Sequence, residues 1–189
     1  MRYILAILTL ILITADCLAQ APFSRLELRI QGTQNVNRNL LHDYWHPANG
    51  VKVSAATPFY AGDWEVNLGV HRFNGSVEAP GFGALWISSG WRLKIPVTTR
   101  IRLKPGIGFG NYRMSFDESV TSYSGERRES DFVGSIGVLA SLDLGRKWFL
   151  FGQAEYLRVQ TRPLMRLWFI SAGIGLQVNT GIFLQTLLE

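Results

Sequence analysis

Apolar and polar side chains alternate along much of the chain in blocks of about ten residues. In the clearest block, residues 64–71, tryptophan, valine and leucine occupy the even positions, and glutamate, asparagine, glycine and histidine occupy the odd ones. Successive side chains of a β-strand point to opposite faces of its sheet. This block therefore predicts a strand with one apolar face and one polar face.

The same alternation recurs and predicts eight strands, at about residues 25–32, 51–56, 64–71, 84–95, 100–110, 132–143, 150–156 and 168–178. The segments that join them alternate between long and short. Outer-membrane barrels have short turns at one end and longer loops at the other. The pattern thus predicts an all-β chain folded as a transmembrane antiparallel up-and-down β-barrel with eight strands.

Alternation alone does not decide which face is outside, because a soluble barrel has its apolar face inside. Glycines on the polar faces favour the membrane form, since they fit a crowded lumen. Large aromatic residues near the strand ends fit the interface girdles of a membrane barrel. They are Trp45, Phe59, Tyr60, Trp64, Phe73, Trp91, Tyr112, Trp148, Tyr156 and Trp168. The alternative is a soluble, lipocalin-like periplasmic binding barrel, with the apolar face of residues 64–70 lining a ligand cavity.

The N-terminus has the order of charge, short apolar run and small residues that is typical of a signal peptide. Arg2 supplies the charge, and Cys17 and Ala19 suit cleavage before Gln20. We therefore expect a cleaved signal peptide at residues 1–19, a barrel at 20–178, and a periplasmic tail or an extra strand at 179–189. The expected location is the bacterial outer membrane.

Charge and cysteine content argue against two properties of this chain, nucleic acid binding and disulfide bonds. The chain has 19 Lys and Arg against 14 Asp and Glu, a formal net charge of +5. The basic residues are interleaved with apolar ones rather than gathered in a phosphate-tracking patch, so no nucleic acid binding is expected. Its one cysteine, Cys17, leaves with the predicted signal peptide, so no disulfide is expected in the mature chain.

With the polar faces pointing inward, the predicted lumen holds a network of charged and polar residues. It comprises Arg25, Glu27, Arg29, Lys52, Glu65, His71, Arg92, Lys94, Arg100, Arg102, Lys104, Asp143 and Glu155. A buried ion without a partner costs several kcal/mol, so these groups must pair or stay hydrated. A salt-bridged plug is the main expectation. The excess of cations around the turn at Pro96 leaves a narrow anion-preferring pore as the alternative.

The sequence offers little for catalysis or metal binding. His42 and His46 are four residues apart, but no HExxH-type motif supports a metal site. The segment His46-Pro47-Ala48-Asn49 is similar to the His-x-Ser-Asn segment of lipid A deacylases, with Ala48 in place of the nucleophilic serine. Without that serine there is no acyl-enzyme chemistry. We expect no enzyme, no cofactor and no metal, and a lipid-modifying barrel enzyme is the alternative.

Taken over residues 20–178, the strand pattern resembles the small eight-stranded OmpA-like and OmpX-like outer membrane barrels. Residues 58–64, PFYAGDW, resemble the first periplasmic turn of such barrels, although the chain ends on Leu187-Leu188-Glu189 rather than on an aromatic residue. The resemblance implies a structural or surface-interaction role through extracellular loops. By length and charge alone, residues 114–130 are the loop expected to carry specificity. It also implies outer membrane lipid, lipopolysaccharide and the barrel assembly machinery as partners, a monomeric state and an unidentified extracellular ligand.

Overall fold

The computed structural model describes residues 23–37, 41–76, 79–117, 128–162 and 164–180. The predicted signal peptide lies outside these ranges, as do residues 181–189, so both expectations stay predictions. Within the described ranges, no helix is long and apolar enough to cross a membrane.

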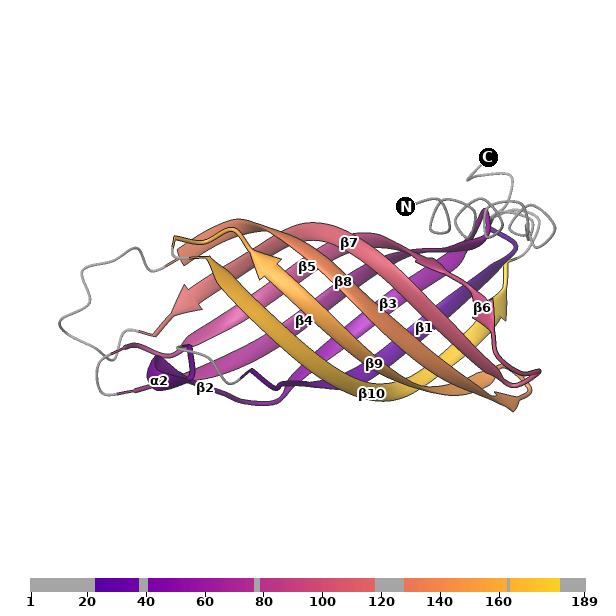
Figure 1. Ribbon diagram of the computed structural model, residues 1–189, viewed down its shortest axis with the longest axis horizontal. Helices are drawn as coiled ribbons and strands as arrows, with labels where there is room; N and C mark the ends of the chain where they lie inside the picture. The colour runs from indigo at the N-terminus through magenta and orange to yellow at the C-terminus, as the bar shows by residue number, and fades with distance from the viewer. Residues whose placement is uncertain (1–22, 38–40, 77–78, 118–127, 163, 181–189) are drawn as a thin grey trace, which may run out of the picture.

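Eight long strands form a closed antiparallel barrel in the described part of the chain (Figure 1). Each strand pairs with the next one along the chain, and β10 pairs with β1 from Arg25 opposite Asn179 to Asn35 opposite Phe169, which closes the ring. The strands are β1 (Arg25–Asn35), β3 (Gly50–Phe59), β4 (Gly62–Gly75), β5 (Phe82–Leu93), β7 (Ile101–Phe116), β8 (Arg128–Gly145), β9 (Trp148–Val159) and β10 (Met165–Asn179). The predicted fold class is confirmed.

The two ends of the barrel differ, as the connection lengths predicted. One end carries tight turns at residues 60–61, 97–100 and 146–147, where Tyr60 and Arg146 adopt positive φ angles of 54° and 61°. We call this end the turn end. The other end carries the longer connections and two short elements, and we call it the loop end. There, α2 (Leu41–Tyr44) and β2 (Trp45–Pro47) lie between β1 and β3, while the two-residue strand β6 (Ile95–Pro96) belongs to the turn end.

Several strands run further than their predicted bounds. β7 continues to Phe116 and β8 begins at Arg128, whereas the sequence predicted strands over 100–110 and 132–143 with a loop over residues 114–130. The alternation of apolar and polar residues marks only the part of a strand that has lipid on one face and a polar lumen on the other. Beyond that stretch, strand pairing continues through backbone hydrogen bonds, which leave no hydropathy signal.

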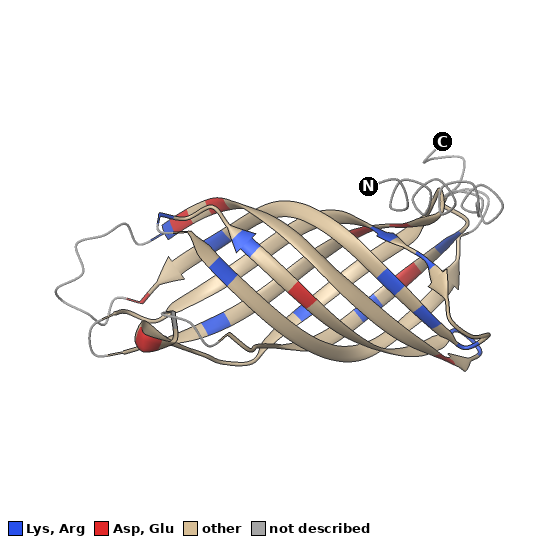
Figure 2. Cartoon of the chain, in the orientation of Figure 1, with Lys and Arg blue, Asp and Glu red and all other residues tan. Residues whose placement is uncertain are grey.

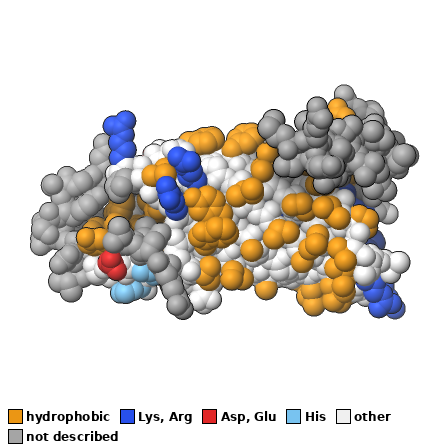
Figure 3. All heavy atoms as spheres, viewed as in Figure 1, with side chains coloured by type: hydrophobic (Ala, Val, Ile, Leu, Met, Phe, Trp, Pro, Cys, Tyr) orange, Lys and Arg blue, Asp and Glu red, His pale blue; other side chains and the backbone are white. Residues whose placement is uncertain are grey.

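The apolar face of each strand points outward. Ile30, Val70 and Ile107 are 53%, 54% and 66% exposed, whereas Glu27 and Lys52 are almost fully buried. Orange apolar side chains accordingly cover the barrel wall between its ends in Figure 3. This orientation is the one predicted for a membrane barrel. It contradicts the lipocalin-like alternative, because the apolar face of residues 64–70 lies on the outside of the barrel and not in its lumen.

The interior is filled by layers of different character. Near the loop end, an apolar core is built from Phe73, Phe82, Ala84, Trp86, Tyr112, Met114, Val133, Leu157, Val159, Met165, Leu167 and Phe169. Leu139, Phe149 and Phe151 form a smaller apolar cluster toward the turn end. Phe73 and Tyr112 are fully buried in the first core, so their predicted place in an interface girdle is wrong. Near the loop end the inward positions are apolar too, and an aromatic residue there cannot be assigned to a face by type alone.

Candidate functional site

The charged residues of the lumen meet around Glu65, which points inward from β4. Arg29 of β1 donates to one oxygen of this carboxylate. Arg92 of β5 donates through Nε to both oxygens, at 2.9 and 2.8 Å. All three side chains are at most 4% exposed. Two guanidinium groups therefore share one buried carboxylate.

A second cluster lies around Lys104 of β7. Its Nζ donates to Glu27 of β1 at 2.7 Å and to Asp63 of β4 at 2.9 Å. Asp63 also pairs with Lys94 at 2.6 Å. Because β7 and β1 are not neighbours in the barrel, the lysine side chain reaches across the lumen to its partner.

A third pair also crosses the lumen, between Lys52 of β3 and Glu155 of β9 at 2.8 Å. The ammonium of Lys52 lies 4.4 Å from the ring centroid of Trp86, which belongs to the apolar core. This cation–π contact joins the ionic layer to the apolar layer above it. The two layers are thus in direct contact along the barrel axis.

Asp63 is a member of the network that the sequence reasoning missed. The segment up to Asp63 was assigned to a turn, but β4 begins at Gly62 and Asp63 is 1% exposed. The signal was present, since Asp63 stands two residues before Glu65 and so shares its face.

Other predicted members lie at the edges of the interior. Arg25 comes within 3.8 Å of Glu27, and Arg102 pairs with Asp143 at 3.3 Å with both side chains partly exposed. Arg100 lies in the turn before β7 and is exposed, so the structure does not place it in the lumen. Figure 2 shows blue and red strand positions interspersed along the turn-end half of the barrel.

His71 is buried but lies apart from the ion pairs. Its Nδ1 is 3.2 Å from the hydroxyl of Thr33, and its ring centroid is 4.4 Å from that of Phe169. It therefore lies between the ionic layer and the apolar core. A Thr–His pair has the atoms of a nucleophile and a base, and here both residues are at most 5% exposed.

The fully buried charges balance. The described residues include four buried cations, Arg29, Lys52, Arg92 and Lys104, and four buried anions, Glu27, Asp63, Glu65 and Glu155. A buried ion must be paired to be stable, and each of these has a partner within 3 Å. The excess of positive charge that suggested anion preference is therefore confined to the partly exposed rim.

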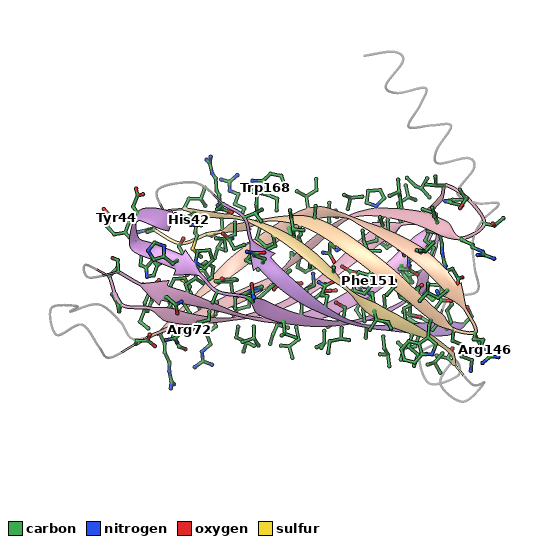
Figure 4. The ribbon with its side chains drawn as sticks, turned by 90° about the horizontal axis from the view of Figure 1, so that it is seen from below. His42, Tyr44, Arg72, Arg146, Phe151 and Trp168 are labelled. Carbon is green, nitrogen blue, oxygen red and sulfur yellow. The ribbon has the colours of Figure 1, made fainter. Side chains whose placement is uncertain are left out.

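Among the described residues, no group of three or more His, Cys, Asp or Glu side chains is arranged to hold a metal ion. His46 is exposed on β2 opposite Asn74, and His42 lies in α2. Figure 4 shows His42, Tyr44 and Arg72 at the loop end and Arg146 at the opposite end.

Comparison with solved structures identifies the same fold in small outer membrane barrels. Neisserial surface protein A has 10% sequence identity and a TM-score of 0.61 over 85% of this chain and 100% of its own. The N-terminal β-barrel domain of Pseudomonas aeruginosa OprF has 11% identity and a TM-score of 0.54, over 84% of this chain and 100% of its own. Ail, the attachment invasion locus protein of Yersinia pestis, has 11% identity and a TM-score of 0.53, with the same coverage.

No protein-family model matches the chain. No curated protein matches it either. At 10–11% identity the structural likeness establishes the fold alone.

Proposed function

We propose that this protein is a bacterial outer membrane barrel that works through its loop end, in a structural or surface-interaction role, and is neither a pore nor an enzyme. The observation that carries the proposal is the filled lumen. An ion-paired layer and an apolar core lie in series along the barrel axis. A barrel of eight strands has little more interior space than its own side chains occupy.

The loop end is built as a fixed surface. β2 pairs with β4, placing Trp45 opposite Gly75 and Pro47 opposite Phe73. The indole of Trp45 donates to the carbonyl oxygen of Pro80 at 2.7 Å and packs edge-on against Phe82, with ring centroids 5.7 Å apart. These contacts fix α2 above the apolar core.

The side chains that α2 and β2 leave outside are polar or aromatic. Tyr44 is 44% exposed, and Asp43 and His46 are exposed beside it. Exposed aromatic and polar groups on a rigid support are the kind of surface that protein interfaces use. In this proposal the fold anchors that surface in the membrane, with lipopolysaccharide around the barrel and the barrel assembly machinery inserting it as a monomer.

Cysteine labelling of intact cells tests the orientation that this role requires. The mature chain is expected to contain no cysteine, because Cys17 lies in the predicted signal peptide. Asp43→Cys at the loop end should react with a membrane-impermeant maleimide on intact cells. Arg146→Cys in the opposite turn is the matched control and should react only after the outer membrane is opened. Labelling of Arg146→Cys on intact cells would overturn the proposal.

A gel assay on the same cells tests the closed barrel. The protein should be recovered in the outer membrane fraction and should migrate differently before and after boiling in detergent. Recovery as a soluble periplasmic protein with unchanged mobility would contradict the membrane assignment.

A further inference from the structure

The outward face of the barrel strands carries charge at one end only. Among the outward positions of the eight strands, as described, the charged residues are Arg72 of β4, Arg113 of β7, Arg128 of β8, Arg158 of β9 and Arg166 of β10. All five are exposed and all lie in the part of their strand nearest the loop end. We call them the arginine belt. Below the belt, the outward positions of these strands are uncharged, and apart from Asn111 of β7 they are apolar or small.

The position and the residue type of the belt both point to a ligand. A charge on the lipid-facing side of a barrel is most costly at the bilayer centre and tolerated near the interface. Lysine would serve solvation equally well at an interface, yet the outward strand positions described here hold only arginine. A guanidinium offers a planar fork of donors that binds phosphate oxygens in pairs.

One part of the belt lines a groove. Arg113 and Arg128 lie on its walls, and Leu85 and Ile87 are also part of its lining, together with Asn111, Glu129 and Ser130; the groove has a volume of about 340 Å³. Ser115 pairs with Arg128 and Ser130 pairs with Arg113, so the two arginines are diagonal neighbours on adjacent strands. Side chains in that relation start about 7–8 Å apart, a separation that one phosphate group can bridge.

The groove is amphipathic. Ser130 donates its hydroxyl to the side-chain oxygen of Asn111 at 2.9 Å, which adds neutral polar groups beside the arginines. Leu85 and Ile87 are 37% and 50% exposed and continue the apolar wall of the barrel. Leu85 lies directly opposite Arg113, and Ile87 lies opposite Asn111, one pair closer to the turn end. The groove therefore sets cations beside apolar side chains, as an anionic headgroup joined to an acyl chain requires.

The other side of the belt repeats the arrangement. Arg158 and Arg166 stand directly opposite each other on β9 and β10. An anion bound between them would contact both guanidinium groups. Tyr156 and Trp168 form the next outward-facing pair toward the turn end. They also lie opposite each other, with ring centroids 4.9 Å apart.

We propose that the arginine belt binds the phosphate groups of an anionic glycolipid in the outer leaflet, and that the Arg113–Arg128 groove is its principal site. The guanidinium groups hold the phosphates while Leu85 and Ile87 contact an acyl chain. The inference rests on the proposed membrane role and assigns it a lipid ligand. The occupant has the chemistry of lipid A, two phosphates on a multiply acylated sugar.

The test uses the purified, folded full chain in detergent, with diphosphorylated lipid A and its dephosphorylated form as probes. Wild-type protein should bind the phosphorylated lipid at least tenfold more tightly than the dephosphorylated one. The double variant Arg113→Gln/Arg128→Gln should lose at least tenfold in affinity for the phosphorylated lipid. Arg100→Gln/Arg146→Gln removes the same number of exposed arginines at the turn end, and its affinity should equal that of the wild type.

Three results would overturn the proposal. They are equal affinity of Arg113→Gln/Arg128→Gln and wild type, equal binding of the two lipids, and competition by inorganic phosphate at millimolar concentration as effective as lipid A itself. The last result would mean a simple anion site without an acyl chain. Because binding is measured on purified protein whose folding is checked by heat-modifiable mobility, its failure is separate from failure of the labelling test on cells.

Discussion

Glu65 is the residue on which two buried arginines depend. Replacing it with glutamine keeps the shape of the side chain but takes from Arg29 its ion-pair partner and leaves Arg92 with Glu155 alone, 3.8 Å away. Breaking a buried ion pair by removing one partner typically costs about 3–5 kcal/mol. We expect Glu65→Gln to lower the free energy of unfolding by about that amount, measured by urea titration of the folded barrel in lipid vesicles.

Asp143→Asn supplies the control for this prediction. It also removes one carboxylate from an arginine, Arg102, but both side chains are partly exposed and solvent replaces the lost contact. Exposed pairs contribute at most about 1 kcal/mol. Equal destabilisation by Glu65→Gln and Asp143→Asn would mean that the lumen is hydrated rather than dry.

At the scale of the strands, the sequence predicted the features that depend on a difference between lipid-facing and lumen-facing side chains. It missed the features that do not depend on that difference. The eight strands follow from alternation because lipid and lumen demand opposite side chains at neighbouring positions. Trp86 and Phe169 escaped assignment, because inward and outward positions are both apolar near the loop end. Which acid meets which base was also beyond the sequence, since pairs such as Lys104 and Glu27 join strands that are not neighbours.

Strand packing gives a prediction for glycine. Gly173 of β10 faces inward, and a Cβ there would lie 2.8 Å from the backbone Cα of Gln31 and closer still to the carbonyl oxygen of Ile30. Backbone cannot move aside as a flexible side chain can. We expect Gly173→Ala to destabilise the barrel by about 1–3 kcal/mol, the usual cost of overpacking.

Gly134→Ala on β8 is the matched substitution, because a Cβ at Gly134 has no atom within 4 Å. Its unfolding free energy should stay within about 0.5 kcal/mol of the wild type, as for other surface changes. The same urea titration measures both variants. A loss at Gly134 as large as that at Gly173 would show that the two positions differ in something other than space.

At the scale of the whole molecule, two successive layers of side chains fill the lumen of the barrel. The ionic layer and the apolar core lie in series, so an ion crossing the lumen must pass both. Opening one layer leaves the other in place, so we expect the charges of the lumen to serve stability rather than selectivity. The loop end and the outward wall are then the surfaces through which the molecule can act.

Bilayer conductance measures this double closure. Wild-type protein reconstituted in a planar bilayer should show no steady conductance. The variant Trp86→Ala/Phe169→Ala, which truncates two large residues of the apolar core, should also fail to conduct, because the ion pairs of Lys52, Glu65 and Lys104 still cross the lumen. Heat-modifiable mobility confirms that the variant is folded, and a general porin confirms that the bilayer can report a pore. Steady current through wild type would return the anion-preferring pore as the better account; current through the variant alone would show that the apolar core is the single barrier.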